Sequence, residues 1–200
     1  EFQPPMEMSV VGKHLRRVVK ENYNDRHVIY ARCAHLTDPQ EIHREQGRGQ
    51  CQNRTICERG CPFGGYFSAN SSTIPWAHRT GNLTLKANSV VHSILYDDGT
   101  GKAIGVNVID AITKVQTKYF SNVVFLNAGA INSTAILLNS ISKRYPNGLG
   151  NDNGLLGKYF GFHNYRALLS ATCPGFEDKV KEGRSPTNEY MPRYVNLNKD

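Results

Sequence analysis

Apolar and polar residues follow two different periods along this chain, and the change of period predicts both helices and strands. Between residues 9 and 22 the apolar residues recur at helical spacing, and Ser9 stands where a side chain can cap the first turn. Residues 28–34 are rich in strand-forming types and predict a mostly buried strand. A short helix is expected over residues 72–78, because Pro75 is tolerated in a first helical turn.

The middle of the chain has the alternating pattern of antiparallel strands. Residues 90–96 and 103–110 flank a cluster rich in Asp and Gly, which predicts a hairpin. A second turn leads to residues 115–120, so we expect a three-stranded meander. Residues 123–126 are uniformly apolar and predict a short, fully buried strand. Beyond it, Ser133 is placed to cap a helix.

A turn of small residues separates that last strand from its helix: Asn127, Ala128, Gly129 and Ala130. In an α/β fold such a turn lets the ribose, adenine or pyrophosphate of a ligand approach the backbone closely. An ordinary strand-to-helix turn with small residues for packing fits the pattern as well. The chain contains no G-x-G-x-x-G sequence, so the usual dinucleotide fingerprint does not support the first interpretation.

The remaining segments have weaker patterns. Residues 37–70 have little periodicity and many Gly, Arg, Gln and Cys residues, which predicts a long, irregular excursion. Two more strands are expected at residues 166–171 and 189–195, with a polar connection at residues 174–186 between them. Taken together, the elements predict an α+β fold.

Composition narrows the class of protein without naming a function. With 39% hydrophobic residues the 200-residue chain can form a core, and no stretch is apolar enough to span a membrane. The net charge of +7 is spread along the chain, so nucleic acid is not an expected partner. The sequence begins without Met and lacks a signal-peptide pattern, and we expect a piece of a longer protein. Cytoplasmic and periplasmic locations both remain open.

Two groups of residues suggest other functions. Cys51, Cys57 and Cys61 form a C-x5-C-x3-C pattern with Cys33 and His35 or His43 nearby, which suggests a zinc or iron–sulfur module; a disulfide or packed, reduced thiols fit the spacing better. The first helix carries a basic stripe that would suit an acidic partner or nucleic acid, or that simply faces solvent: Lys13, Arg16, Arg17 and Lys20.

The segment at residues 123–140 resembles the second signature of the glucose-methanol-choline (GMC) oxidoreductases. It has a Gly, a small residue, a Ser or Thr, a pair of aliphatic residues and a Ser in the family's order. The chain departs from the family at Thr134, where Pro or Ser is preferred, and at Ile141, where Gly is usual.

Other segments resemble the family in the same order. Residues 91–108, with Gly105 and Val106, are similar to the family's adenine-contacting hairpin, and residues 156–163 are similar to the segment that leads into its substrate domain. Residues 57–65 with the Ser-Ser-Thr that follows resemble the Cys-containing branch, typified by bacterial gluconate and related sugar dehydrogenases.

The resemblance implies an FAD enzyme that oxidises an alcohol group of a sugar, polyol or sugar acid and passes electrons to an acceptor such as a cytochrome or quinone. It implies cofactor contacts at these residues: Val91, Asn127, Ala128, Gly129 and Ala130. The family's flavin fingerprint and catalytic His lie outside the matching segments, and His163 is not that His. We therefore expect no catalytic residue and no metal ligand in this chain, and no activity from it alone.

The same resemblance implies a division of the chain. Residues 1–70 would hold a helix, a strand and the Cys-rich excursion at the junction of the FAD and substrate domains. Residues 71–150 would be part of a Rossmann-like FAD/NAD(P)-binding domain with its meander. Residues 151–200 would begin an antiparallel-sheet substrate-binding domain.

Overall fold

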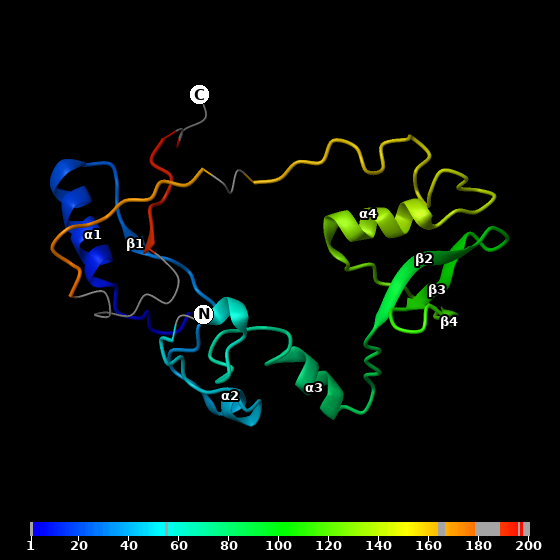
Figure 1. Ribbon diagram of the computed structural model, residues 1–200, viewed down its shortest axis with the longest axis horizontal. Coiled ribbons are helices and arrows are strands. Elements are labelled where there is room, and N and C mark those ends of the chain that lie inside the picture. The colour runs from blue at the N-terminus through cyan, green and yellow to red at the C-terminus, as the bar shows by residue number, and fades with distance from the viewer. Residues whose placement is uncertain (1, 55, 164–166, 179–188, 196, 198–200) are drawn as a thin grey trace. The chain divides into compact units, whose positions relative to one another are not determined.

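The computed structural model describes residues 2–54, 56–163, 167–178, 189–195 and 197 (Figure 1). Helices and antiparallel strands occur together, which confirms the α+β class. In the described part of the chain no helix has both the length and the apolar character needed to cross a membrane. The elements in chain order are α1 (Val10–Asn22), β1 (Ile29–Tyr30), α2 (Glu41–Glu45), the 3-10 helix η1 (Cys57–Arg59), α3 (Thr73–Arg79), β2 (Ser89–Asp97), β3 (Lys102–Asp110), β4 (Gln116–Phe120), α4 (Gly129–Asn139) and β5 (Glu189–Tyr190).

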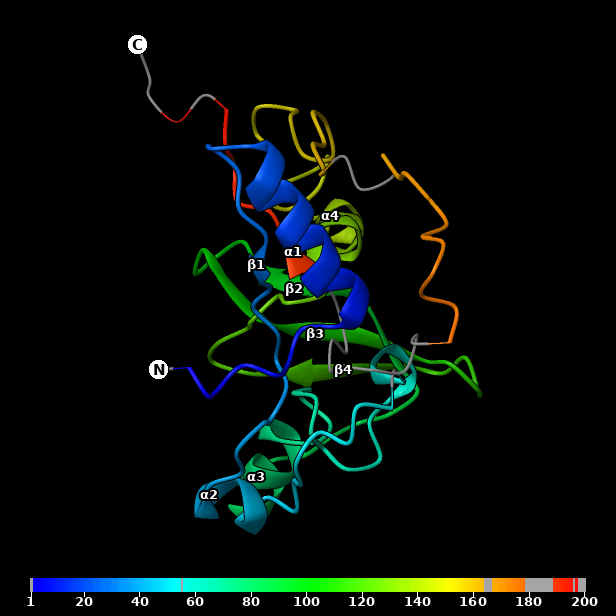
Figure 2. The same ribbon diagram turned by 90° about the vertical axis from the view of Figure 1, so that its left-hand side faces the viewer.

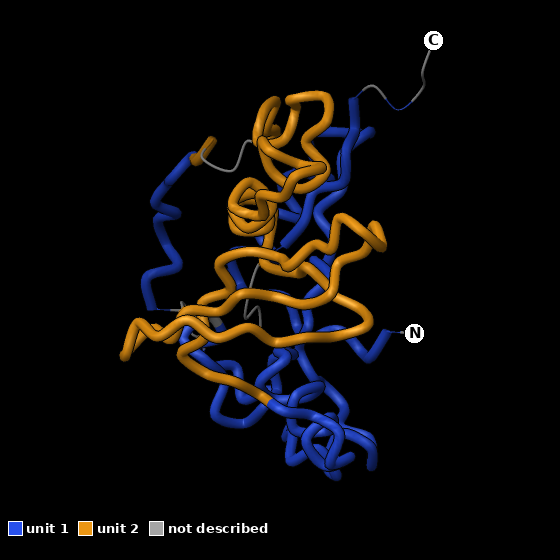
Figure 3. The backbone as a smooth tube through the Cα atoms, turned by 90° about the vertical axis from the view of Figure 1, so that its right-hand side faces the viewer, with its two compact units in different colours: residues 1–84, 169–200 blue, residues 85–168 orange. Residues whose placement is uncertain are grey.

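The chain forms two compact units (Figure 3). The first contains residues 1–84 and 169–200, and the second contains residues 85–168. Each unit has its own antiparallel sheet: β1 pairs with β5 in the first, and β2, β3 and β4 lie in that order in the second.

The first unit is built around α1, whose predicted start is confirmed. The Ser9 hydroxyl oxygen accepts a hydrogen bond from the Gly12 N–H at 3.0 Å and donates one to Glu189 Oε1 at 2.9 Å. A carboxylate at a helix N-terminus is favoured by the helix dipole. A Cβ atom at Gly12 would lie 2.1 Å from the same Oε1, so glycine at this position leaves room for Glu189.

The strand predicted at residues 28–34 is mostly wrong. Val28 is buried with Met8 and Val19 against α1, which lies along β1 in Figures 1 and 2, but only Ile29 and Tyr30 form a strand. Both residues are 41% exposed, because among the described residues the two-residue ladder with β5 gives the segment one short partner strand. The strand predicted at residues 189–195 is likewise reduced to β5.

In the second unit the predicted hairpin and meander are confirmed. β2 pairs with β3 and β3 pairs with β4, both antiparallel. The ladder pairs Val91 with Val108 and then Ser93 with Asn107, so His92 is an extra residue that forms a β-bulge. A bulge increases the local twist and changes the direction of the strand.

Two predictions for the segment after β4 are wrong. Residues 123–126 are not a strand, and Val123 and Phe125 are 63% and 82% exposed. A buried strand needs neighbours that take up its backbone hydrogen bonds, and no described strand pairs with this segment. The helix α4 begins at Gly129 with Ala128 as its N-cap, so Ser133 lies inside the helix instead of capping it.

The helix α4 tolerates the unusual Thr134. Its hydroxyl donates a hydrogen bond to the Ala130 carbonyl oxygen at 2.7 Å, one turn back, and the helix continues without a break to Asn139. Further along, the strand predicted at residues 166–171 is wrong for residues 167–171, which have no regular structure. Residue 166 and most of the predicted connection at 174–186 lie outside the described residues.

The turn between β2 and β3 is tied to the loop after α4 by one carboxylate. Asp98 accepts hydrogen bonds from the backbone N–H groups of Arg144 at 2.9 Å and Lys143 at 3.0 Å, and from the Ser142 hydroxyl at 3.0 Å. These donors, with the Arg144 N–H first, lower the pKa of Asp98 although partial desolvation raises it. The loop is therefore held by a group that must be ionised.

We expect Asp98→Asn to destabilise the protein in a pH-dependent way. Because the pKa of Asp98 is lower when folded, its stabilisation is present above the unfolded value of about 3.9 and is lost as the pH falls through the folded value. Urea unfolding of wild type and variant should differ most at pH 7 and converge in strong acid. Asp178→Asn is the control, since the Asp178 carboxylate accepts no hydrogen bond from the described residues. A difference that persists unchanged in acid would contradict this account.

Candidate functional site

Val91, the predicted adenine contact, lies on an edge strand. The sheet order is β2, β3, β4, so in the described part of the chain one edge of β2 is not paired with another strand. Its side chain is half-buried, and the His92 bulge follows directly. Backbone N–H and C=O groups on an unpaired strand edge can bond to a ligand.

The turn at residues 127–130 is exposed and leads directly into α4. The N-cap Ala128 makes no side-chain hydrogen bond to the first turn of the helix, and that turn has no acidic residue. Gly129 has a φ of 78°, and no atom lies within 4 Å of the position that a Cβ would take. The helix therefore presents uncapped N–H groups beside open space, an arrangement that favours negatively charged groups such as phosphate.

A buried serine joins the two predicted cofactor elements within the second unit. Ser140, just after α4, accepts a hydrogen bond from the Ile94 N–H of β2 at 2.8 Å and donates one to the Ile136 carbonyl oxygen at 2.6 Å. Figure 1 shows α4 lying along the sheet beside β2. The packing of α4 on β2 thus fixes the turn at one end of the helix relative to the strand that carries Val91.

The role of Ser140 was not predicted from the sequence. The serine belongs to the signature pattern, but periodicity says nothing about which backbone group its hydroxyl reaches. Its burial, at 2% exposure, could have been suspected only from the apolar residues around it. An Ile94 N–H without this acceptor would be a buried, unsatisfied donor.

These elements fit the adenosine end of a dinucleotide. The edge strand offers backbone groups for hydrogen bonds to a base, and the small residues of the turn leave space for ribose and pyrophosphate beside the helix N-terminus. The residues that would hold the cofactor are the predicted ones: Val91, Asn127, Ala128, Gly129 and Ala130. None of them carries an acid, a base or a nucleophile, so the arrangement is suited to binding and positioning a ligand and not to catalysis.

The Cys-rich excursion in the first unit is more ordered than its sequence suggests. Three segments are joined by backbone hydrogen bonds: Leu36 N–H to Gly65 O at 2.6 Å, Cys51 N–H to Leu36 O at 2.8 Å, and Gly49 N–H to Phe63 O at 2.7 Å. A Cβ on Gly65 would come within 2.9 Å of the Cys51 backbone. Glycine at this position therefore allows the segments to cross closely.

Four of the five cysteines and one histidine gather around this crossing, and we call them the sulfur cluster: Cys33, His35, Cys51, Cys57 and Cys61. The His35 Nε2 atom lies 3.4 Å from Cys57 Sγ. All five cysteines are in the described part of the chain, and no disulfide joins them. Among the described residues no three His, Cys, Asp or Glu side chains are arranged to hold a metal ion.

The basic stripe of α1 is exposed, as expected for a solvated helix face. All four of its basic side chains face solvent. Lys13 forms an ion pair with Glu7, and Arg17 lies 3.2 Å from His14 Nδ1. Exposed pairs of this kind contribute little to stability.

Comparison with known proteins places these elements in context. The sequence profile described as GMC oxidoreductase matches residues 7–163, which include β2, the small-residue turn and the sulfur cluster. The chain is also similar to a 2-methyl-1,2-propanediol dehydrogenase of Mycolicibacterium austroafricanum, with 33% identity over 113 residues. That alignment covers 56% of this chain but only 20% of the dehydrogenase, so the chain spans about a fifth of the length of this relative.

Proposed function

The chain belongs to the GMC oxidoreductase family, and we propose that it supplies part of the FAD site of a protein that oxidises an alcohol group. The observation that carries this proposal is that the family match extends over residues 7–163 and contains both predicted cofactor elements. The fit of the small-residue turn and the edge strand to a dinucleotide supports it.

Each cofactor element has a distinct role in this proposal. The backbone of Val91, in the edge strand β2, would contact the adenine. The turn residues and the first N–H groups of α4 would contact the ribose and pyrophosphate, because the helix dipole favours negative charge there. FAD, when bound, supplies a ring that accepts hydride from the alcohol carbon. The chain's own residues bind and orient, and we assign no catalytic residue among them.

The proposed substrate is a small polyol or sugar. The relative acts on a diol by its name, and the Cys-rich segment resembles the branch of sugar dehydrogenases. We place the start of the substrate-binding domain in residues 151–200 and propose a cytochrome or quinone as the electron acceptor.

The natural full-length protein tests the proposal directly. It should purify with bound FAD and visible flavin absorption, and a small diol, polyol or sugar added without oxygen should bleach that absorption. Simple monoalcohols of the same size, compared in the same assay, report whether the second hydroxyl matters. A colourless protein that takes up no FAD from solution would refute the proposal, and a yellow protein bleached only by monoalcohols would refute the substrate class.

A further inference from the structure

The strand β2 contains one residue more than its partner strand β3 at the place where it carries Val91. In the described ladder Val91 is paired with Val108, and Ser93 is paired with Asn107. His92, between them, has no partner residue in β3. An extra residue of this kind bends its strand, increases the local twist and leaves backbone groups out of the ladder. The bulge therefore directly follows the residue whose backbone is the proposed adenine contact.

The register keeps the side chain of Val91 on the buried face of the sheet. Residues that lie opposite each other in an antiparallel ladder direct their side chains to the same face. Val91 lies opposite Val108, and Ile94 lies opposite Val106. Since Val106 and Val108 are two positions apart in β3, all four side chains share one face, on which Val108 and Ile94 are 7% and 9% exposed.

The hydrogen bond between β2 and α4 lies beyond the bulge. The Ile94 N–H is bonded to Ser140 Oγ at 2.8 Å, so this donor is not available to a ligand. In the described part of the chain no hydrogen bond joins α4 to Val91 or His92. The backbone at the bulge is therefore available to a ligand on the edge of β2.

The imidazole of His92 does not explain why the bulge is present. Its Nδ1 atom lies 3.3 Å from the hydroxyl oxygen of Ser93, which is the next residue. Among the described residues no hydrogen bond links this side chain to a distant part of the fold. The side chain therefore makes no long-range contact that would require the strand to bend here.

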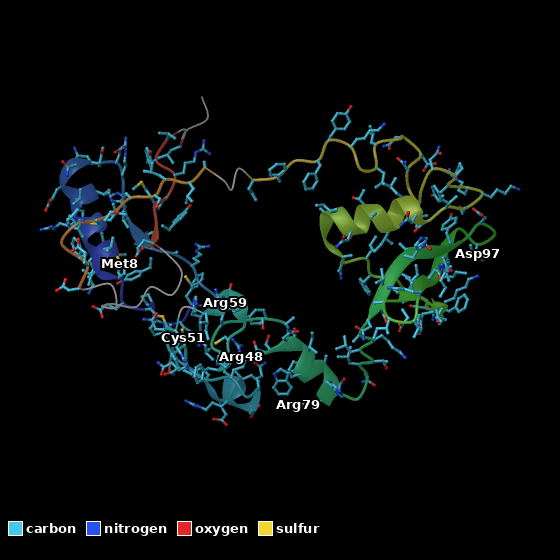
Figure 4. All side chains as sticks on the ribbon, viewed as in Figure 1. Met8, Arg48, Cys51, Arg59, Arg79 and Asp97 are labelled. Atoms are coloured by element: carbon cyan, nitrogen blue, oxygen red, sulfur yellow. The ribbon has the colours of Figure 1, made fainter. Side chains whose placement is uncertain are left out.

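A second register shift in the same hairpin does have a packing cause. The extra residue there is Ile104 of β3, beside Gly105. A Cβ on Gly105 would lie 2.1 Å from the Tyr119 carbonyl oxygen, so this shift coincides with a close approach of β4. It lies near the turn that follows Asp97, which Figure 4 labels at the end of the hairpin. The bulge at His92 has no comparable cause in the described part of the chain.

We propose that the bulge at His92 positions the backbone of Val91 for the adenine of FAD. This inference rests on the proposed function, in which the edge of β2 is part of an FAD site. His92 is a positioning residue that acts through its backbone, because the bend takes N–H and C=O groups out of the ladder and makes them available to a base. Adenine has a hydrogen-bond donor beside an acceptor on one edge, which matches the N–H and C=O groups of a strand edge.

Deletion of His92 tests this role, because the deletion leaves the register unchanged. Val91 would directly precede Ser93, and the partners of these two residues are already adjacent in β3, so a regular ladder keeps the same side chains on each face. We expect the natural full-length protein with this deletion to bind FAD roughly tenfold more weakly when the apoprotein is titrated, which corresponds to the loss of about one hydrogen bond. ADP, which carries the adenosine end without the flavin ring, should compete with FAD and lose affinity by a similar factor.

Two further variants and one measurement on the wild type isolate the effect of the bulge. His92→Ala contains the extra residue without the imidazole, and it should recover most of the affinity that the deletion removes. Deletion of Ile104 removes the second register shift from the same hairpin, so it should lower stability in urea and leave both affinities unchanged. In the wild type, which needs no deletion to fold, FAD should slow the hydrogen exchange of the amides of residues 91–93 but not of residues 102–104.

Several results would overturn this inference. Equal losses of FAD affinity in His92→Ala and in the deletion would assign the effect to the imidazole. A deletion that binds FAD as tightly as the wild type, or that weakens FAD without changing competition by ADP, would show that the bulge does not position the adenine. So would an absence of ADP competition or of protection at residues 91–93 in the wild type. A wild-type protein that takes up no FAD would instead refute the proposed function itself.

Discussion

Replacing Gly105 with alanine is expected to lower the free energy of unfolding of the second unit by about 3 to 4 kcal/mol. A Cβ at this position would lie 2.1 Å from the Tyr119 carbonyl oxygen and 2.9 Å from the Phe120 Cα. Both atoms belong to the backbone of β4, so no change of rotamer relieves the overlap. The central and edge strands would have to separate, with loss of ladder hydrogen bonds.

Urea unfolding measures this effect, and hydrogen exchange locates it. Amide groups of β3 and β4 should exchange faster in Gly105→Ala, whereas those of α1 should not change. Gly99→Ala is the matched control in the adjacent hairpin, because a Cβ there meets only Asp97 Oδ1 at 3.4 Å. If the two variants have the same stability, β4 does not pass as close to β3 as the structure indicates.

The elements that were predicted correctly are those whose causes are local. The start of α1 depends on Ser9 and the N–H of Gly12, three residues away. The hairpin of β2 and β3 depends on alternation and on a turn of Asp and Gly residues. In each case the residues that determine the element are within a few positions of one another, so the sequence pattern contains them.

Most of the elements that were missed depend on distant partners. Residues 123–126 have the apolar composition of a buried strand, but composition does not provide the neighbouring strands that bury it. Ser133 is a good N-cap by type, yet α4 already starts at Gly129, which has a φ of 78°; this miss is local, because residue type alone does not fix the first residue of a helix. The hydrogen bonds from the Lys143 and Arg144 N–H groups to Asp98 join residues more than 40 positions apart, and no local sequence pattern predicts them.

The candidate sites divide in the same way. The small-residue turn could be predicted from the sequence because its defining feature, the lack of bulky side chains, is visible there. The arrangement of the sulfur cluster could not be predicted, since the spacing of Cys57 and Cys61 is compatible with a metal site, a disulfide and free thiols. The 3.4 Å contact between His35 Nε2 and Cys57 Sγ joins residues 22 positions apart, which only the folded chain brings together.

Gly129→Val is expected to weaken FAD binding by the natural protein at least about tenfold, a loss of roughly 1.4 kcal/mol of binding free energy. The position now offers open space beside the first N–H groups of α4. A branched side chain there would occupy the space that we propose for ribose and pyrophosphate. It would also disfavour the φ of 78° that starts the helix at this residue. Flavin content after purification and titration of the apoprotein with FAD measure the loss.

A matched variant separates the ligand effect from backbone strain. Gly81 has a φ of 71° and, like Gly129, no atom within 4 Å of a Cβ, but it follows α3 in the first unit. Gly81→Val should therefore cost similar stability and leave FAD affinity unchanged, because the strain is the same and the proposed contact is absent. Equal losses of FAD in the two variants would mean that strain alone explains the effect. Full FAD affinity in Gly129→Val would show that the turn is not part of the cofactor site, since a valine side chain there would overlap with a ligand bound beside it.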